Sequence, residues 1–300
     1  MRIAVIGSGT MGNGIAHTFA QFGHSVNLID VDQKFLDKAI NTIDKNLQRQ
    51  VDKGEIELNI KDHALSNIKT YIDLEAGVSQ VELIVEAASE NLELKLNIFR
   101  EIDKFAMPET ILASNTSSIS ITKIASVTSR ADKVIGMHFM NPVPVMKLVE
   151  VIRGYETSNE TTKLIMGLSQ ALNKTPVVVN DYPGFIANRI LMPMINEAIY
   201  SLYEGVAGIE ETDTIMKLGM AHPMGPFQLA DFIGLDVCLS ILKVLQDGFG
   251  NPKYAPCPLL INMVAAGKTG RKSGEGFYIY TDGSKEIKVS EKFSKRNLLS

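Results

Sequence analysis

Two ionisable residues, 12 positions apart, could together move a proton. His138 follows the apolar run Val134–Met137, and histidine exchanges protons near neutral pH. Glu150 lies in the otherwise apolar segment Lys147–Val151, where an unpaired carboxylate is costly to bury. A carboxylate beside the imidazole would fix its tautomer and stabilise its protonated form. The residues alone leave two interpretations open: a general acid/base pair, or a structural histidine and a separate buried ion pair.

A glycine-rich turn near the N-terminus is suited to hold a dinucleotide. The segment Gly7-Ser8-Gly9-Thr10-Met11-Gly12 follows the strand-like run Ile3–Ile6 and precedes a helix-like stretch. The first glycine permits a tight turn, the second lets the backbone approach a pyrophosphate, and the third lets the helix pack on the strand. The first helical turn offers backbone N–H groups to the phosphates. The predicted contacts are Gly7, Gly9, Thr10, Met11 and Gly12.

Asp30 indicates which dinucleotide this turn would take. It ends the second strand-like run, Val26–Ile29, about 20 residues past the glycines, where a carboxylate accepts hydrogen bonds from the adenosine ribose. The same carboxylate would repel a 2′-phosphate. We therefore predict NAD rather than NADP. The alternative is a glycine turn without a ligand and an aspartate that caps a helix.

The other histidines and the cysteines have simpler explanations. His17 and His24 lie in and just after the first expected helix, and His63 lies in a polar connection, so packing or surface positions account for them. Cys238 and Cys257 lack the CxxC or metal-ligand spacing. We expect free thiols in a reducing compartment and no metal site.

Strand-like and helix-like segments alternate from Arg2 to about Asn180, with amphipathic stretches such as Lys34–Lys53 and Leu92–Phe105 between apolar runs. This alternation predicts an α/β fold: a Rossmann-type, doubly wound, mostly parallel sheet with helices on both faces. The carboxyl ends of such strands are where ligands bind. The expected strands are Ile3–Ile6, Val26–Ile29, Leu83–Val85, Ile111–Ala113, Val134–Met137, Lys147–Val151 and Thr175–Val179.

The pattern changes near Asp181-Tyr182-Pro183-Gly184, where Pro and Gly interrupt it. Beyond it, Phe185–Glu204, Glu210–Leu218 and Phe227–Gln246 are each predicted as one helix. We predict an NAD-binding domain over residues 1–182, an all-helical substrate and dimerisation domain over 183–282, and a loose polar tail over 283–300. The long first helix is apolar on more than one face, so we expect a homodimer through the helical domain.

Composition excludes several other classes of protein. The 300 residues are 45% hydrophobic and 21% charged, with a formal net charge of −4, a balance that gives no reason to expect a nucleic acid partner. No apolar run reaches the roughly 18 residues of a membrane span. The N-terminus enters a strand-like run at once and lacks the pattern of a signal peptide. We expect no membrane partner and a cytoplasmic location.

Five segments spread over the first 280 or so residues together resemble one family. Their residue types and order are similar to those of the L-3-hydroxyacyl-CoA dehydrogenases, and the short chain without fused domains resembles the bacterial 3-hydroxybutyryl-CoA dehydrogenases. The segments are Ala113-Ser114-Asn115-Thr116-Ser117-Ser118, His138-Phe139-Met140-Asn141-Pro142-Val143-Pro144-Val145-Met146-Lys147-Leu148-Val149-Glu150-Val151, Asp181-Tyr182-Pro183-Gly184-Phe185-Ile186-Ala187-Asn188-Arg189, Met224-Gly225-Pro226-Phe227 and Gly274-Glu275-Gly276-Phe277-Tyr278.

The resemblance implies roles for the chemistry-bearing residues. His138 would be the general base for oxidation and the acid for reduction, oriented by Glu150. Ser117 would hydrogen-bond the reacting C3 oxygen, and Asn188 would steady the substrate as charge develops. Without the resemblance, Ser117 and Asn188 would be ordinary cap or turn residues.

The resemblance also implies further cofactor contacts, from Glu90, Lys95, Ser117, Asn141 and Lys272. For Glu90 and Lys95 a charge in the first turn of a helix and a solvated lysine are equally good explanations.

A CoA thioester would bring phosphates to a basic surface. Lys45, Arg49 and Lys53 recur at intervals of 4 residues, which places them on one stripe of the expected helix Lys34–Lys53, and Lys38 roughly continues it. The resemblance implies CoA binding here, most recognisably at Lys53 and also at Arg49. Relatives with serine at the position of Asn46 leave that contact open, and a solvated helix face would explain the whole stripe equally well.

The predicted activity is NAD-dependent interconversion of (S)-3-hydroxyacyl-CoA and 3-ketoacyl-CoA, with short chains such as 3-hydroxybutyryl-CoA and acetoacetyl-CoA expected. Two alternatives remain at this level. One is an NAD-dependent dehydrogenase of a free 3-hydroxy acid, although such enzymes typically use a lysine base. The other is a non-catalytic NAD-binding or structural relative.

Overall fold

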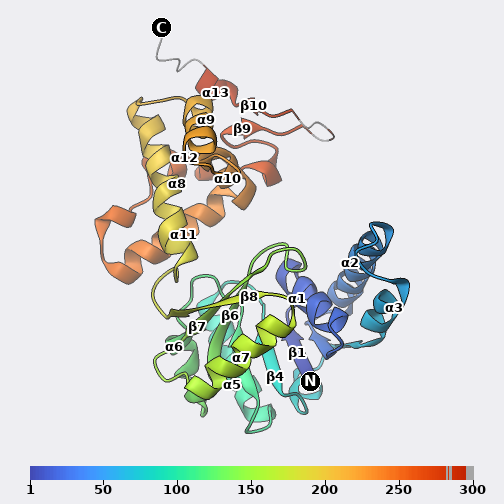
Figure 1. Cartoon of the computed structure of the whole chain (residues 1–300). Helices are drawn as coiled ribbons and strands as arrows, with labels where there is room; N and C mark the ends of the chain where they lie inside the picture. Colours follow the sequence, from blue (N-terminus) through green and yellow to red (C-terminus); the bar gives the residue numbers. More distant parts are fainter. Residues whose placement is uncertain (282, 284–285, 295–300) are drawn as a thin grey trace. The chain divides into compact units, whose positions relative to one another are not determined.

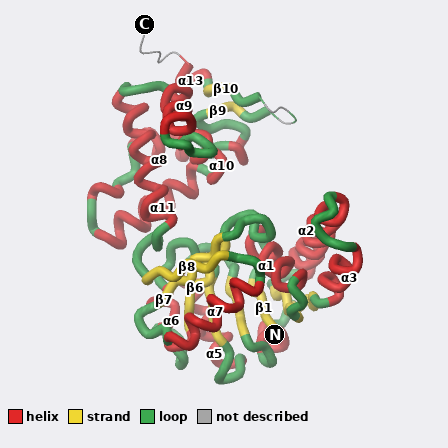
Figure 2. The backbone as a smooth tube through the Cα atoms, viewed as in Figure 1, coloured by secondary structure: helices red, strands yellow, loops and turns green. Residues whose placement is uncertain are grey.

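The computed structural model describes residues 1–281, 283 and 286–294, and the chain divides into two compact units, Met1–Phe185 and Ile186–Ser300. Figure 2 shows strands concentrated in the first unit and helices in the second. The division falls three residues after the predicted position of 182.

The first unit is built on an eight-stranded sheet of order β3-β2-β1-β4-β5-β6-β7-β8 (Figure 1). All neighbouring strands are parallel except β6 and β7, which are antiparallel. This confirms the predicted Rossmann-type, mostly parallel fold. The strands are β1 (Arg2–Ile6), β2 (Ser25–Ile29), β3 (Ile68–Tyr71), β4 (Leu83–Glu86), β5 (Ile111–Ser114), β6 (Val134–Phe139), β7 (Leu148–Arg153) and β8 (Thr175–Asn180).

Alternate residues of the central strands feed two separate cores. Ile3 and Val5 of β1 belong to one cluster, with helix residues such as Phe19, whereas Ala4 belongs to another, with Phe99. Because side chains alternate across a strand, the sheet carries a helical layer on each face. The helices are α1 (Thr10–Gln21), α2 (Gln33–Asp52), α3 (Leu58–Ser66), α4 (Leu74–Val78), α5 (Leu92–Phe105), α6 (Ile121–Ala125), η1 (Ala131–Lys133) and α7 (Asn159–Ala171).

Strand β3 was not among the predicted strands. It pairs in parallel with β2, and all four of its residues are partly or fully exposed. An edge strand with little burial carries no strong apolar pattern, so its sequence, Ile-Lys-Thr-Tyr, resembles a polar connection.

The second unit is mainly helical, with α8 (Ala187–Glu204), α9 (Ile209–Gly219), α10 (Pro226–Ile233), α11 (Leu235–Phe249), η2 (Pro252–Tyr254), α12 (Pro258–Ala265) and η3 (Arg271–Ser273). The prediction of one helix over Phe227–Gln246 was wrong. Gly234 lies between the end of α10 and the start of α11. Its φ of +105° is a backbone conformation that residues with a side chain rarely adopt. None of the helices that the structure describes has the length and apolarity to cross a membrane.

Part of the region predicted as a loose tail is folded. Residues Lys288–Val289 (β10) pair antiparallel with Tyr278–Ile279 (β9), and Glu291–Ser294 form a short helix, α13. Phe293 is buried in the core of the helical unit. The prediction overlooked that the few apolar residues of this polar segment pack on the core, since Ile287 and Val289 also contact it. The rest of the predicted tail, at 284–285 and 295–300, lies outside the described residues.

Candidate active site

The glycine turn between β1 and α1 is shaped by close backbone approach. Gly7 has φ +92°, and a Cβ there would lie 2.7 Å from the Ala87 carbonyl oxygen. A Cβ at Gly12 would lie 1.7 Å from the Gly7 carbonyl oxygen, so the start of α1 packs directly on the turn. Gly9 differs, because a Cβ there would meet nothing within 4 Å. Two glycines are therefore required by packing, and the middle one leaves space beside the helix N-terminus.

A cleft of about 960 Å³ opens at this turn, entirely within the first unit. It is lined by the glycine turn with Thr10 and Met11, by Phe35, Lys38, Thr42 and Asn46 of α2, and by Asn141–Pro144. No side chain caps the N-terminus of α1, so its first N–H groups are not satisfied by a cap. An open floor of backbone N–H groups at a helix N-terminus fits a dinucleotide pyrophosphate.

Asp30 lines the same cleft and also holds the turn together. Its Oδ2 accepts hydrogen bonds from the Ser8 N–H (2.7 Å) and hydroxyl (2.6 Å), and its Oδ1 accepts one from the Val31 N–H (2.8 Å). A carboxylate has about four lone-pair sites, so these bonds leave capacity for a ribose hydroxyl. The link to Ser8 was not foreseen from the sequence, although Ser8 lies inside the glycine motif.

His138 and Glu150 lie opposite each other on the antiparallel strands β6 and β7. The distance from His138 Nδ1 to Glu150 Oε2 is 2.8 Å. Both residues are buried, at 9% and 3% exposure. A buried carboxylate on Nδ1 directs the exchangeable position of the ring to Nε2. The structure therefore brings together the two residues that the sequence suggested as a pair.

The loop after β5, which carries Ser117, is tied to the end of β6. Asn115 Oδ1 accepts a hydrogen bond from the Phe139 N–H (2.9 Å), one residue beyond His138. Because β5 and β6 are parallel neighbours, their carboxyl ends meet at one edge of the sheet. Ser117, Asn141 and His138 thus all follow or end strands at this edge.

Glu90 organises the Ser117 loop. Its Oε1 accepts hydrogen bonds from Thr116 Oγ1 (2.6 Å), Ser117 N (3.0 Å) and Ser118 Oγ (2.9 Å). Burial raises the pKa of Glu90, but Lys95 and these hydrogen bonds outweigh it, so the pKa lies below its ordinary value. The sequence suggested a cofactor contact or a helix-end charge, and missed this loop contact.

Lys95 is 1% exposed and lies between two carboxylates. Its Nζ contacts Glu86 Oε1 (2.7 Å) and Oε2 (2.9 Å), and lies 3.4 Å from Glu90 Oε2. Ser114 Oγ also donates to Glu86 (2.7 Å). The interpretation of Lys95 as a solvated lysine, which the sequence left open, was wrong. Its contact with a cofactor stays a prediction.

The remaining predicted site residues lie elsewhere. Asn188 and Lys272 belong to the second unit, where Asn188 is in the first turn of α8 and Lys272 pairs with Asp236 (2.6 Å). Arg49 and Lys53 are exposed near the end of α2, and Lys53 lies 3.9 Å from Glu55. The roles of these four residues stay predictions.

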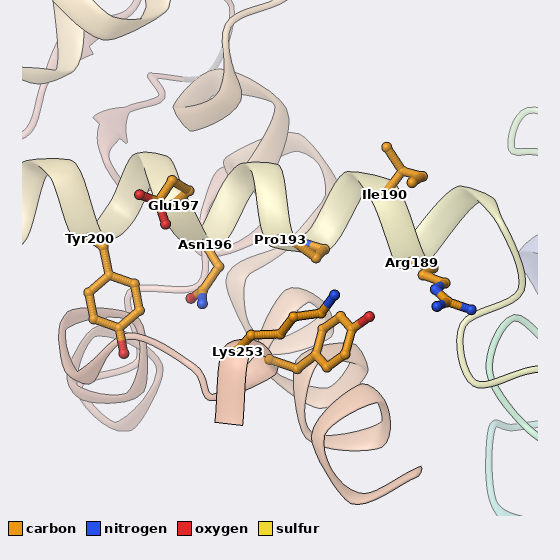
Figure 3. A pocket seen from close by; sticks show the side chains of 8 residues that line it. Arg189, Ile190, Pro193, Asn196, Glu197, Tyr200 and Lys253 are labelled. Atoms are coloured by element: carbon orange, nitrogen blue, oxygen red, sulfur yellow. The ribbon is translucent and has the colours of Figure 1, made fainter. Parts of the chain in front are cut away.

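The helical unit carries a smaller groove of about 420 Å³ beside α8. Figure 3 shows Pro193, Asn196 and Tyr200 extending from α8 on the side of Lys253. Asn196 Nδ2 donates to the Ala255 carbonyl (2.9 Å), which fixes the η2 segment against α8. The groove contains none of the predicted catalytic residues.

Both units match models of one family in chain order. Residues 2–182 match the NAD-binding domain of 3-hydroxyacyl-CoA dehydrogenase, and residues 184–280 match its C-terminal domain. Fold and matches together define an NAD-dependent oxidoreductase. The chain belongs to the 3-hydroxyacyl-CoA dehydrogenase family.

Relatives cover nearly the whole chain. It is 52% identical over 282 residues to a probable 3-hydroxybutyryl-CoA dehydrogenase of Bacillus subtilis (94% of this chain, 98% of the relative). It is 51% identical over 280 residues to a 3-hydroxybutyryl-CoA dehydrogenase of Clostridioides difficile (93% and 99%). The crystal structure of (S)-3-hydroxybutyryl-CoA dehydrogenase from Ralstonia eutropha matches with a TM-score of 0.91 and 48% identity (94% and 99%).

Proposed function

We propose that this enzyme interconverts (S)-3-hydroxybutyryl-CoA and acetoacetyl-CoA, with His138 as the group that takes and returns the hydroxyl proton. The observation that carries the proposal is the buried pair of His138 Nδ1 and Glu150 Oε2, 2.8 Å apart at the carboxyl edge of the sheet. The short acyl chain is supported by the names of relatives that share about half of the sequence.

The glycine turn, Asp30 and Asn141 would hold the cofactor, because all line the 960 Å³ cleft. When bound, NAD supplies the acceptor or donor of the hydride at C3. Glu90, Lys95, Ser117 and Lys272 are further proposed contacts. For Glu90 and Lys95 the contact would be shared with their mutual ion pair.

During oxidation, Nε2 of His138 takes the proton of the substrate hydroxyl. Glu150 accepts the hydrogen bond from Nδ1 throughout and stabilises the imidazolium that forms. During reduction the imidazolium returns the proton to the C3 oxygen. Ser117 would donate a hydrogen bond to that oxygen, and Asn188 would hold the acyl unit as charge develops.

The exposed end of α2 would bind the CoA phosphates. Arg49 and Lys53 are exposed to solvent, and Lys38 and Asn46 of the same helix line the cleft. The test is the KM for acetoacetyl-CoA at several salt concentrations. In the wild type KM should rise with ionic strength, and in Lys53→Ala this rise should be smaller. An unchanged salt dependence in that variant would remove Lys53 from the site.

We also propose a homodimer formed through the helical unit. This unit exposes large apolar side chains that would otherwise remain in water: Ile186, Ile190, Tyr203, Val206, Ile215, Leu218 and Met220. Sedimentation velocity should give a dimer for the wild type, and Ile190→Glu should shift it toward monomer. Tyr155→Glu, at an 86% exposed position of the first unit, is the matched control. A monomeric wild type would contradict the proposal.

A cytoplasmic location is supported by the two buried, free thiols, Cys238 and Cys257. Cell fractionation should place the protein with cytosolic markers, and recovery in an oxidising compartment would contradict this.

One assay separates the proposed function from its alternatives. NADH oxidation is followed with acetoacetyl-CoA and, in parallel, with free acetoacetate. Turnover of the CoA ester alone is expected. Turnover of the free acid alone would favour a 3-hydroxy acid dehydrogenase, and NADH binding without turnover of either would favour a non-catalytic protein.

A further inference from the structure

A buried lysine outside the catalytic pair holds the loop that joins the two catalytic strands. Lys174 lies between α7 and β8 and is 7% exposed. Its Nζ donates to the carbonyl oxygens of Val143 (2.5 Å) and Met146 (2.8 Å). Among the described residues Lys174 makes no ion pair with a carboxylate. A buried ammonium whose partners are two backbone carbonyls has a structural task there.

The loop in question runs from Asn141 to Lys147, between His138 on β6 and Glu150 on β7. Beside the two bonds from Lys174, the next residue, Thr175, donates its N–H to the Lys147 carbonyl (2.7 Å). Within the loop, the N–H groups of Val145 and Met146 both donate to the Pro142 carbonyl. Three loop carbonyls are thus held by two consecutive residues of another segment.

The same loop also lines the cofactor cleft. Asn141, Pro142, Val143 and Pro144 all line it. Val143 packs so closely on α1 that a Cβ at Gly14 would lie 3.0 Å from Val143 Cβ. A loop held between α1 and Lys174 has little room to shift, because packed interiors leave few voids.

We infer that Lys174 is a positioning residue for the dinucleotide site: by holding the carbonyls of Val143 and Met146, it fixes the cleft wall that begins at Asn141. The inference rests on the proposed cofactor site. It concerns cofactor affinity rather than proton transfer, because the His138–Glu150 contact is made between paired residues of β6 and β7 and not by residues of this loop.

The charges around Lys174 are few. His17 on α1 and Lys147 at the end of the loop are the titratable groups that interact with it. Burial, and then Lys147, lower the pKa of Lys174 to about 8. Burial lowers the pKa of His17 to about 4, with Lys174 adding to the effect, so His17 is neutral at physiological pH. The ammonium therefore stays protonated near pH 7, and neither neighbour is a carboxylate that would pair with it.

The test is the dissociation constant of NADH, measured by its own fluorescence, which suits a chain without Trp. Lys174→Met leaves two loop carbonyls without a donor and should raise the NADH Kd about 5-fold or more, while kcat at saturating NADH changes less than about 3-fold. Lys174→Arg, which keeps the donors and the charge, should restore Kd to within about 2-fold of wild type. Lys163→Met, at an exposed position of α7, is the matched control and should change neither.

Amide hydrogen exchange supplies an independent readout. In Lys174→Met, exchange should accelerate in the peptide that covers residues 139–147 and stay unchanged in β1 and β4. If Lys174→Met does not fold, Lys174→Gln takes its place; its shorter side chain keeps an amide donor but loses the charge, so the same changes are expected at smaller size. A folded variant with a wild-type NADH Kd, or one that loses kcat with Kd unchanged, would overturn the inference. Failure of the wild type itself to bind NADH would instead overturn the proposed cofactor site.

Discussion

Both units of the chain bury carboxylates, but the partners differ. In the first unit, Glu150 faces a titratable imidazole across two strands. In the second, Asp213 accepts hydrogen bonds from Phe227 N (2.9 Å) and the Tyr278 hydroxyl (2.8 Å). Asp231 accepts bonds from Phe277 N (3.0 Å), Tyr278 N (2.9 Å) and the Tyr280 hydroxyl (3.1 Å).

The difference teaches how the same side chain serves catalysis or architecture. The donors to Asp213 and Asp231 are backbone N–H groups and tyrosine hydroxyls, which keep their protons near neutral pH, so these carboxylates hold the α10 N-terminus and the β9 segment in place. Glycines confirm that tight role, because a Cβ at Gly225 would lie 2.2 Å from Asp213 Cγ and one at Gly276 would lie 2.0 Å from Asp231 Oδ1. An imidazole changes its charge near neutral pH, so Glu150 can respond to a proton.

The largest expected effect comes from removing the imidazole while keeping its hydrogen bond. His138→Gln can still donate an amide N–H to Glu150 but cannot take a proton. We expect kcat to fall about 1000-fold, within the range of general acid–base catalysis, with the NADH Kd and the melting temperature close to wild type. Steady-state kinetics, NADH fluorescence and thermal unfolding check this. Turnover within about 10-fold of wild type would remove His138 from the chemistry.

The architectural carboxylates should respond in stability. Asp231→Ala leaves the N–H groups of Phe277 and Tyr278 buried without an acceptor, so we expect a loss of about 2–4 kcal/mol in the free energy of unfolding of the helical unit. The free energy of unfolding is measured by urea titration, followed by amide hydrogen exchange in peptides of this unit. The control is Asp247→Ala, at an exposed position of α11, which should cost less than about 0.5 kcal/mol. Equal effects of the two variants would break the comparison.

Much of this contrast could be foreseen in the sequence, and part of it could not. The apolar residues on both sides of Glu150 predict that its carboxylate is buried. His138, at the end of the preceding predicted strand, is then the partner that the sequence suggests. Asp213 and Asp231 carry no such signal, because each lies on an amphipathic helix and its donors come from residues 14 to 65 positions away. Their role is visible only in the folded structure, where the β9 segment contacts both carboxylates.

The same reasoning explains the other differences. Gly234 looked like a tolerated glycine within a long helix, and only its positive φ shows that the helix breaks there. Lys174 precedes a strand without any pattern around it, since its partners are backbone carbonyls that have no residue type to recognise. The glycine turn was predictable because its requirements are local.

The smallest expected effect is a difference in the sign of the pH dependence. Burial raises the pKa of Asp231 to about 6, above its ordinary value of 3.8, whereas the pKa of Glu90 lies below its ordinary value of 4.5. As pH falls, Asp231 is therefore protonated in the folded helical unit before it is protonated in the unfolded chain. The free energy of unfolding of this unit rises as pH falls from about 6 toward 3.8. Glu90 contributes stability above pH 4.5, which is lost as pH falls through its lowered pKa.

We expect Asp231→Asn to remove a pH-dependent term on the order of 1 kcal/mol between pH 4 and 7, and Glu90→Gln to remove one of opposite sign at lower pH. Unfolding free energies of wild type and variants, compared at each pH, isolate both. Terms of the same sign in the two variants would contradict the assignment of these environments.

The most direct test of the His138–Glu150 pair is a double-mutant cycle on kcat with acetoacetyl-CoA. Two residues that act as one unit lose their function together, so His138→Gln and Glu150→Gln should cost about 1000-fold and about 100-fold singly, and the double variant should cost no more than His138→Gln alone. Losses that multiply, to about 100,000-fold, would show that the carboxylate and the imidazole contribute independently, and the paired mechanism would be wrong.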